Sequence, residues 1–235
     1  MKFLRVFIVI FLLNLSLDIY FNNTKEYHDY RIITKPLITI LLAVFFFVNS
    51  YRMLIRQRLI ILGALLLLCA GDIALLENTP FYSFIFGLTF FLIAILFYSL
   101  YFYKQARYDI DRLIPFLAVS LLISLSVIYL MYDNLNNLLI PVMIYLVSVL
   151  NLLKLAYLRY KNVNMKSYSL VFLGISCFTI AQVAVGLNRF YTVLPYKDIG
   201  IMLFYGASQL FIIVGILTFK TQTENKLQED AFFIK

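Results

Sequence analysis

LIILGALLLLCAGDIALL, the segment Leu59–Leu76, is an apolar run that contains one carboxylate, Asp72, directly after Gly71. Arg58 and Glu77 bracket the eighteen residues of this run. A helix of this length measures about 27 Å, close to the roughly 30 Å of hydrocarbon in a bilayer. The segment therefore predicts a transmembrane helix with an acidic side chain inside it.

Asp72 is the first candidate functional residue. An ionisable side chain costs about 2.5–3.5 kcal/mol at the centre of a transmembrane helix, so it is expected to face the bundle interior and to act there. The alternative is that Asp72, which lies within one turn of the helix end, only reaches interfacial water.

The composition excludes a soluble globular domain, because 63% of the residues are hydrophobic and only 14% are charged. The net charge of +8 comes from basic residues in short loops between apolar runs, a distribution typical of membrane proteins and not of nucleic-acid binding. Cys69 and Cys177 fall inside apolar runs and His28 is the single histidine, so neither a disulfide framework nor a metal site is predicted. No glycine-rich phosphate loop or other cofactor motif occurs.

Apolar runs bounded by charged or turn residues predict an all-α fold, an integral membrane bundle of eight transmembrane helices. Pro36 would lie in the first turn of the second span, where proline is well tolerated. The predicted spans are residues 3–21, 36–51, 59–76, 82–103, 113–132, 138–158, 168–187 and 199–219.

The N-terminus resembles a signal peptide, with Lys2 and Arg5 ahead of an apolar core. No small-x-small cleavage site follows, only polar residues from Asp18 onward, so the first span is predicted to be retained. Its removal would leave an odd number of spans. Residues 1–220 then form a single transmembrane domain, and residues 221–235 form a short cytoplasmic tail.

Lys and Arg are divided unequally between the two sides of this topology. Of the 20 basic residues, 15 fall on one side and 5 on the other. Because cytoplasmic loops carry an excess of Lys and Arg, both termini are predicted to be cytoplasmic. The protein is thus expected to be a multi-pass protein of a bacterial-type inner (plasma) membrane.

Several polar residues share one depth, in the outer half of the predicted bundle. Tyr205 and Gln209 lie four residues apart on one helix face. Polar groups in hydrocarbon are costly unless they partner one another, which predicts a single polar site. The residues at this depth are Lys35, Asp72, Gln182, Arg189, Tyr205 and Gln209.

Each of these residues also has a purely structural interpretation. Lys35 and Arg189 could extend to the membrane interface. Gln182 and Gln209 could hydrogen-bond across helices as packing contacts.

Short motifs follow one another in a specific order along the chain. They are Lys35-Pro36-Leu37 with Thr39, Ala70-Gly71-Asp72, Phe86-Gly87 through Phe91 to Phe97-Tyr98, Pro141 and Tyr145, Gly174 through Phe178, Leu187-Asn188-Arg189-Phe190, and Tyr205 with Gln209. In this order, over roughly residues 32–219, they resemble the lysoplasmalogenase (YhhN-like) family of polytopic membrane proteins.

The resemblance implies a membrane hydrolase that cleaves the vinyl ether bond of lysoplasmalogens, giving a fatty aldehyde and a glycerophospho-base. Asp72 would be the acid, since a carboxyl group in low-dielectric surroundings can hold a proton at neutral pH. Lys35 or Arg189 would neutralise the phosphate of this lysophospholipid-type substrate. The substrate-binding residues implied are Lys35, Arg189, Tyr205, Gln209 and Tyr98.

The sequence departs from the family at two positions. Gln182 stands where the family usually has an aspartate, and Ile95 stands where it usually has a histidine. Glutamine can position water but cannot take its proton, so Gln182 is expected to orient water beside Asp72. Two alternatives remain open: a catalytically inactive lipid-binding relative, and a small transporter, which should carry polar residues along the whole depth of the bundle.

Overall fold

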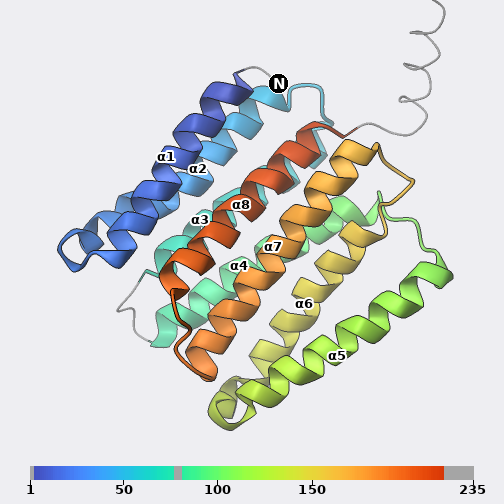
Figure 1. Cartoon of the computed structure of the whole chain (residues 1–235). Helices are drawn as coiled ribbons and strands as arrows, with labels where there is room; N and C mark the ends of the chain where they lie inside the picture. The colour runs from blue at the N-terminus through green and yellow to red at the C-terminus, as the bar shows by residue number, and fades with distance from the viewer. Residues whose placement is uncertain (1–2, 77–80, 220–235) are drawn as a thin grey trace, which may run out of the picture.

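The computed structural model describes residues 3–76 and 81–219, and this part of the chain is helical throughout, without strands. Figure 1 shows an up-and-down bundle in which the N-terminus and the C-terminal end of α8 lie at the same end. The helices are α1 (Leu4–Asn23), α2 (Arg31–Asn49), α3 (Ile55–Ala74), α4 (Phe81–Tyr103), α5 (Ile110–Leu135), α6 (Leu139–Tyr157), α7 (Met165–Phe190) and α8 (Lys197–Leu217), with 3-10 turns η1 (Lys25–Tyr30) and η2 (Asn136–Leu138).

Within the described residues, seven helical segments are long and apolar enough to cross a membrane, as expected of a multi-pass membrane protein. The all-α prediction is confirmed, but the count of eight spans is wrong, because η2 joins α5 and α6 into one segment of 48 residues, Ile110–Tyr157. The polar residues around Asn136 suggested a longer loop, whereas the three-residue 3-10 turn η2 joins α5 directly to α6. Figure 1 shows α5 and α6 folding back beside each other at that turn, where Asn136 has a φ of 43°.

The second span begins earlier than predicted. α2 starts at Arg31, so Pro36 lies in the second helical turn and not in the first. We predicted a boundary there because Arg31 and Lys35 are charged, yet both side chains are buried within the bundle. The predicted tail, residues 221–235, lies outside the described residues.

The closest helix packing occurs between α7 and α8 and depends on two glycines. A Cβ atom on Gly174 would lie 2.9 Å from the backbone nitrogen of Ile212, and one on Gly215 would lie 3.0 Å from that of Val171. Small residues of this kind let membrane helices approach closely. α8 also packs on α1 and α2, and α3 packs on α2 and α4. α4 in turn packs on α6. Helices α3 and α8 therefore border the interior where polar side chains meet.

Arg159, between α6 and α7, is fully buried and joins the α4–α5 connection to α7 and, through Ser167, to α8. Its Nε donates to Gln105 Oε1 at 2.9 Å and its Nη2 donates to Ser167 Oγ at 3.0 Å. Ser167 Oγ in turn donates to the Gly215 carbonyl at 2.7 Å. Burial lowers the pKa of the Arg159 guanidinium to about 10, so the group stays charged at neutral pH.

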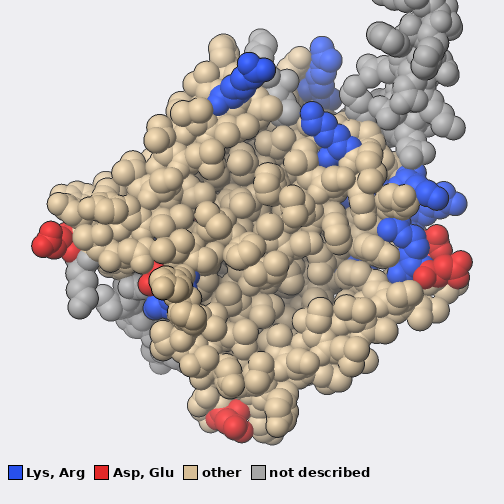
Figure 2. Space-filling model, viewed as in Figure 1, with Lys and Arg blue, Asp and Glu red and all other residues tan. Residues whose placement is uncertain are grey.

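Charged side chains are confined to the ends of the bundle on the face shown in Figure 2, and the belt between them is uncharged. Lys and Arg gather at the end that carries the N-terminus. The middles of the helices expose large apolar side chains such as Leu66 of α3, Leu121 of α5 and Val147 of α6. An uncharged belt between charged ends is the surface expected of a bundle in contact with lipid.

Candidate functional site

Asp72 faces the interior of the bundle, near the C-terminal end of α3. Its side chain is buried, with 1% of the residue exposed, and Tyr205 Oη of α8 donates to Asp72 Oδ2 at 2.8 Å. The carboxyl group therefore has a specific partner on another helix, and it does not reach out to interfacial water.

Phe91 of α4 packs against this pair. A Cβ atom on Gly71 would lie 2.5 Å from Phe91 Cδ2, so only glycine lets the Phe91 ring sit this close to α3. The rings of Phe91 and Tyr205 have centroids 6.0 Å apart. The glycine before Asp72 thus serves to bring an aromatic ring of α4 against the Asp72–Tyr205 pair.

Lys35 of α2 lies close to Asp72. Its Nζ donates to the carbonyl of Leu75, one turn beyond Asp72 on α3, at 3.2 Å. Helices α2, α3 and α8 therefore converge on Asp72.

The sequence analysis missed a second buried carboxylate, Asp18 of α1, which is 0% exposed. Thr34 Oγ1 donates to Asp18 Oδ1 at 2.7 Å, and Arg31 Nε lies 3.7 Å from the same oxygen. Asp18 falls inside the predicted first span, so the cost of an ionisable side chain in hydrocarbon predicts a buried partner for it as it does for Asp72. Its place among the polar residues that follow the first apolar core hid this signal.

A basic pocket of about 510 Å³ opens beside Lys35. Four cations line it, Arg31, Lys35, Arg189 and Lys197, together with one carboxylate, Asp198. Its volume lies in the range of about 300–1,000 Å³ typical of small-ligand sites. A pocket with this excess of cations suits an anionic group.

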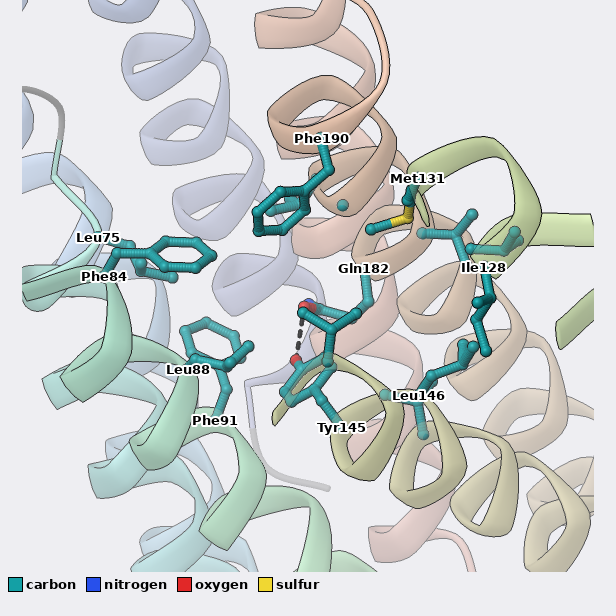
Figure 3. A pocket seen from close by; sticks show the side chains of 16 residues that line it. Leu75, Phe84, Leu88, Phe91, Ile128, Met131, Tyr145, Leu146, Gln182 and Phe190 are labelled. Carbon is teal, nitrogen blue, oxygen red and sulfur yellow. Dashed lines mark hydrogen bonds between the residues drawn. The ribbon is translucent and has the colours of Figure 1, made fainter. Parts of the chain in front are cut away.

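An apolar pocket of about 70 Å³ lies next to the basic pocket, and Leu75, Phe84 and Val185 line both. This volume equals that of about two water molecules in liquid water. Gln182 and Tyr145 supply its polar groups, and Tyr145 Oη donates to Gln182 Oε1 at 2.6 Å. Figure 3 shows this pair pointing into the pocket opposite the aromatic rings of α4.

The Tyr98–Gln209 pair joins α4 to α8. Tyr98 Oη donates to Gln209 Oε1 at 3.2 Å, and both side chains are buried. Gln209 Nε2 has no hydrogen-bond partner within the described residues. Because Gln209 follows Tyr205 by one turn, this pair and the Asp72–Tyr205 pair lie one above the other along α8.

The residues predicted to share one depth thus separate into distinct contacts. Asp72 bonds with Tyr205, Gln209 with Tyr98, and Gln182 with Tyr145, while Lys35 and Arg189 line the basic pocket. Arg189 is exposed and its guanidinium stacks 5.2 Å from the centroid of the Phe84 ring. Among the hydrogen bonds of the described residues, none joins Gln182 to Asp72.

The fold and this interior define a class: a multi-pass α-helical membrane protein with a buried carboxyl group, Asp72, three residues before Leu75, which lines both a basic and an apolar pocket. The chain belongs to the YhhN family, whose family model matches residues 30–216 and confirms the resemblance seen in the sequence. Comparisons with curated proteins and with solved structures give no match. The family match begins at the start of α2, so α1 and its Asp18 lie outside it.

Proposed function

We propose that the protein is a membrane-embedded lysoplasmalogenase, which hydrolyses the vinyl ether bond of lysoplasmalogens to a fatty aldehyde and a glycerophospho-base. One observation carries this proposal: Asp72, which is buried and paired with Tyr205, precedes Leu75 by three residues, and Leu75 lines both the basic and the apolar pocket. The YhhN family includes lysoplasmalogenases.

The two pockets match the two ends of a lysolipid. The phosphate fits the basic pocket, where Lys35 or Arg189 would neutralise it. The apolar pocket has room for the first carbons of the hydrocarbon chain, and the rest of the chain would extend into the bilayer. The vinyl ether, which joins these two ends, would then lie at Leu75, close to Asp72.

The chemistry requires an acid and a water molecule. Asp72 would protonate the outer vinyl carbon, which converts the ether into an oxocarbenium ion. Water then adds to the carbon attached to oxygen, its released proton returns to the carboxylate, and the resulting hemiacetal collapses into the aldehyde and the free alcohol. Tyr205 would hold the carboxyl group in position, and Gln182 with Tyr145 would orient the water.

The proposal includes a topology. Both termini would lie in the cytoplasm of a bacterial-type inner membrane, because α5 and α6 fold back beside each other and return the chain to the side it left. The end of the bundle rich in Lys and Arg would then face the cytoplasm. The basic pocket, at the opposite end, would take lipid from the outer half of the bilayer.

The test is release of fatty aldehyde from a lysoplasmalogen by the purified protein in detergent. Wild type should release aldehyde, and Asp72→Asn, which keeps the size and an acceptor for Tyr205 but loses the acid, should release none. Asp133→Asn is a matched control, because Asp133 is exposed at the C-terminal end of α5, lines neither pocket and should not affect the rate. Absence of aldehyde from a folded wild-type protein would contradict the proposal.

The second candidate is a lipid-binding protein without this activity. Gln182, in the place of the family's usual aspartate, is engaged by Tyr145 and cannot accept a proton from water. Ile95, in the place of the usual histidine, is fully buried in the core. Binding of lysolipid without aldehyde release would establish this candidate in place of the hydrolase.

A further inference from the structure

Arg31 is a buried cation with unused hydrogen-bonding capacity. Its side chain is only 5% exposed, it lines the basic pocket, and its Nε has no hydrogen-bond partner within the described residues. The hydrogen bonds of this part of the chain include none from its guanidinium group. Because a buried donor without a partner is costly, such a group in a pocket wall suits an anionic ligand.

The other cations of the basic pocket are engaged or more exposed. Lys35 donates to the Leu75 carbonyl and lies close to Asp72. Arg189 stacks on Phe84, and Lys197 lies 3.9 Å from Asp198. Arg31 therefore has the most hydrogen-bonding capacity left for a ligand.

Asp18 lies on the side of Arg31 that faces α1. Its Oδ1 is fixed by the Thr34 hydroxyl, one turn beyond Arg31 on α2, and lies 3.7 Å from Arg31 Nε. Asp18 is fully buried and does not line the basic pocket. Because the carboxylate lies on the Nε side, the two terminal nitrogens of the guanidinium remain available to a ligand in the pocket. Their spacing matches that of two oxygens of a phosphate.

We infer that Arg31 binds the phosphate of the lipid substrate, and that Asp18 is a positioning residue that holds the Arg31 guanidinium at the pocket wall. This inference rests on the proposed function for the identity of the ligand, but phosphate binding does not require catalysis. It adds α1, which lies outside the family match, to the substrate site.

The test compares two ligands that the protein cannot hydrolyse. One is a 1-O-alkyl lysophospholipid, and the other is the 1-O-alkylglycerol with the same chain and no phosphate. The ratio of their dissociation constants, measured by calorimetry with the purified protein in detergent, gives the preference for phosphate. Arg31→Gln should lower this preference about 10- to 100-fold, the value of a hydrogen bond to a charged group, and should leave alkylglycerol binding unchanged.

Arg58→Gln is the matched control. It removes the same charge at the opposite end of α3, where Arg58 donates to the Phe47 carbonyl, and it should leave the phosphate preference unchanged. If Arg31→Gln does not fold, Arg31→Lys is measured in its place. It keeps the charge opposite Asp18 but should lose part of the preference, because an ammonium group cannot make the bidentate contact.

Asp18→Asn separates positioning from simple repulsion. If Asp18 positions Arg31, the variant should lower the phosphate preference several-fold, and it should have no further effect in the Arg31→Gln background. If Asp18 only repelled the phosphate, its neutralisation would raise the preference. A raised preference, or a wild-type preference in Arg31→Gln or Arg31→Lys, would overturn the inference. Failure of aldehyde release alone would overturn the hydrolase and leave this inference standing.

Discussion

Replacement of Tyr205 by phenylalanine should destabilise the protein more than the same replacement of Tyr98. Both hydroxyls are buried, and Tyr205 donates to Asp72 at 2.8 Å whereas Tyr98 donates to Gln209 at 3.2 Å. Hydrogen bonds between membrane helices contribute about 0.6 kcal/mol on average and about 1.7 kcal/mol at most. The shorter bond to a carboxyl group should lie near the maximum and the longer one near the average, so the expected difference is about 1 kcal/mol.

The measurement is the free energy of unfolding in mixed micelles of a mild detergent and dodecyl sulfate. Asp72→Leu removes the acceptor of Tyr205, so its double variant with Tyr205→Phe should show a coupling energy of about 1 kcal/mol. The double variant with Tyr98→Phe should be additive, because Tyr98 bonds with Gln209. Equal costs of the two tyrosine replacements, or additivity of Asp72→Leu with Tyr205→Phe, would refute the role of this hydrogen bond in joining α3 to α8.

Three further substitutions test the packing and the site. Gly71→Ala should lower the free energy of unfolding by about 1–3 kcal/mol in the same assay, because the new Cβ would lie 2.5 Å from the Phe91 ring. Gly200→Ala is the control: Gly200 has open space around it, so this change should be neutral or slightly stabilising. Gln182→Asp should raise aldehyde release about a hundredfold by supplying a base, and Gln182→Asn should not. Arg159→Gln should cost about 1–3 kcal/mol of unfolding free energy, because it leaves buried acceptors without their donor.

The positions of the helices could be predicted from the sequence because hydrocarbon imposes a simple rule. Each crossing needs a long apolar run, and the runs are visible without knowledge of any contact. The rule failed where a helix continues through polar residues. η2 links α5 to α6 through a reversing turn of only three residues, and α2 begins at Arg31, whose charge is compensated by Asp18 from another helix.

The depth of the candidate site could be predicted, but its internal contacts could not. Helical periodicity places Tyr205 and Gln209 on one face, and span direction places them level with Asp72. Which side chain bonds with which depends on helix packing, which the sequence pattern does not encode. Gln182 therefore belongs with Tyr145 in the apolar pocket, although its depth suggested that it shares a single polar site with Asp72.

Arg31 and Lys35 lie one turn apart on α2; Asp18 of α1 lies 3.7 Å from Arg31 Nε, and Lys35 Nζ donates to the Leu75 carbonyl. Removal of Asp18 alone would leave the buried Arg31 without its opposite charge, which costs about 3–5 kcal/mol. The two cations are not interchangeable. A guanidinium has five donors, so Arg31 can face Asp18 through Nε and still bind a phosphate through its terminal nitrogens. Lys35 has a single ammonium group that already donates to the Leu75 carbonyl, so it can contribute its charge to the neutralisation of a phosphate while Arg31 supplies the bidentate hydrogen bonds.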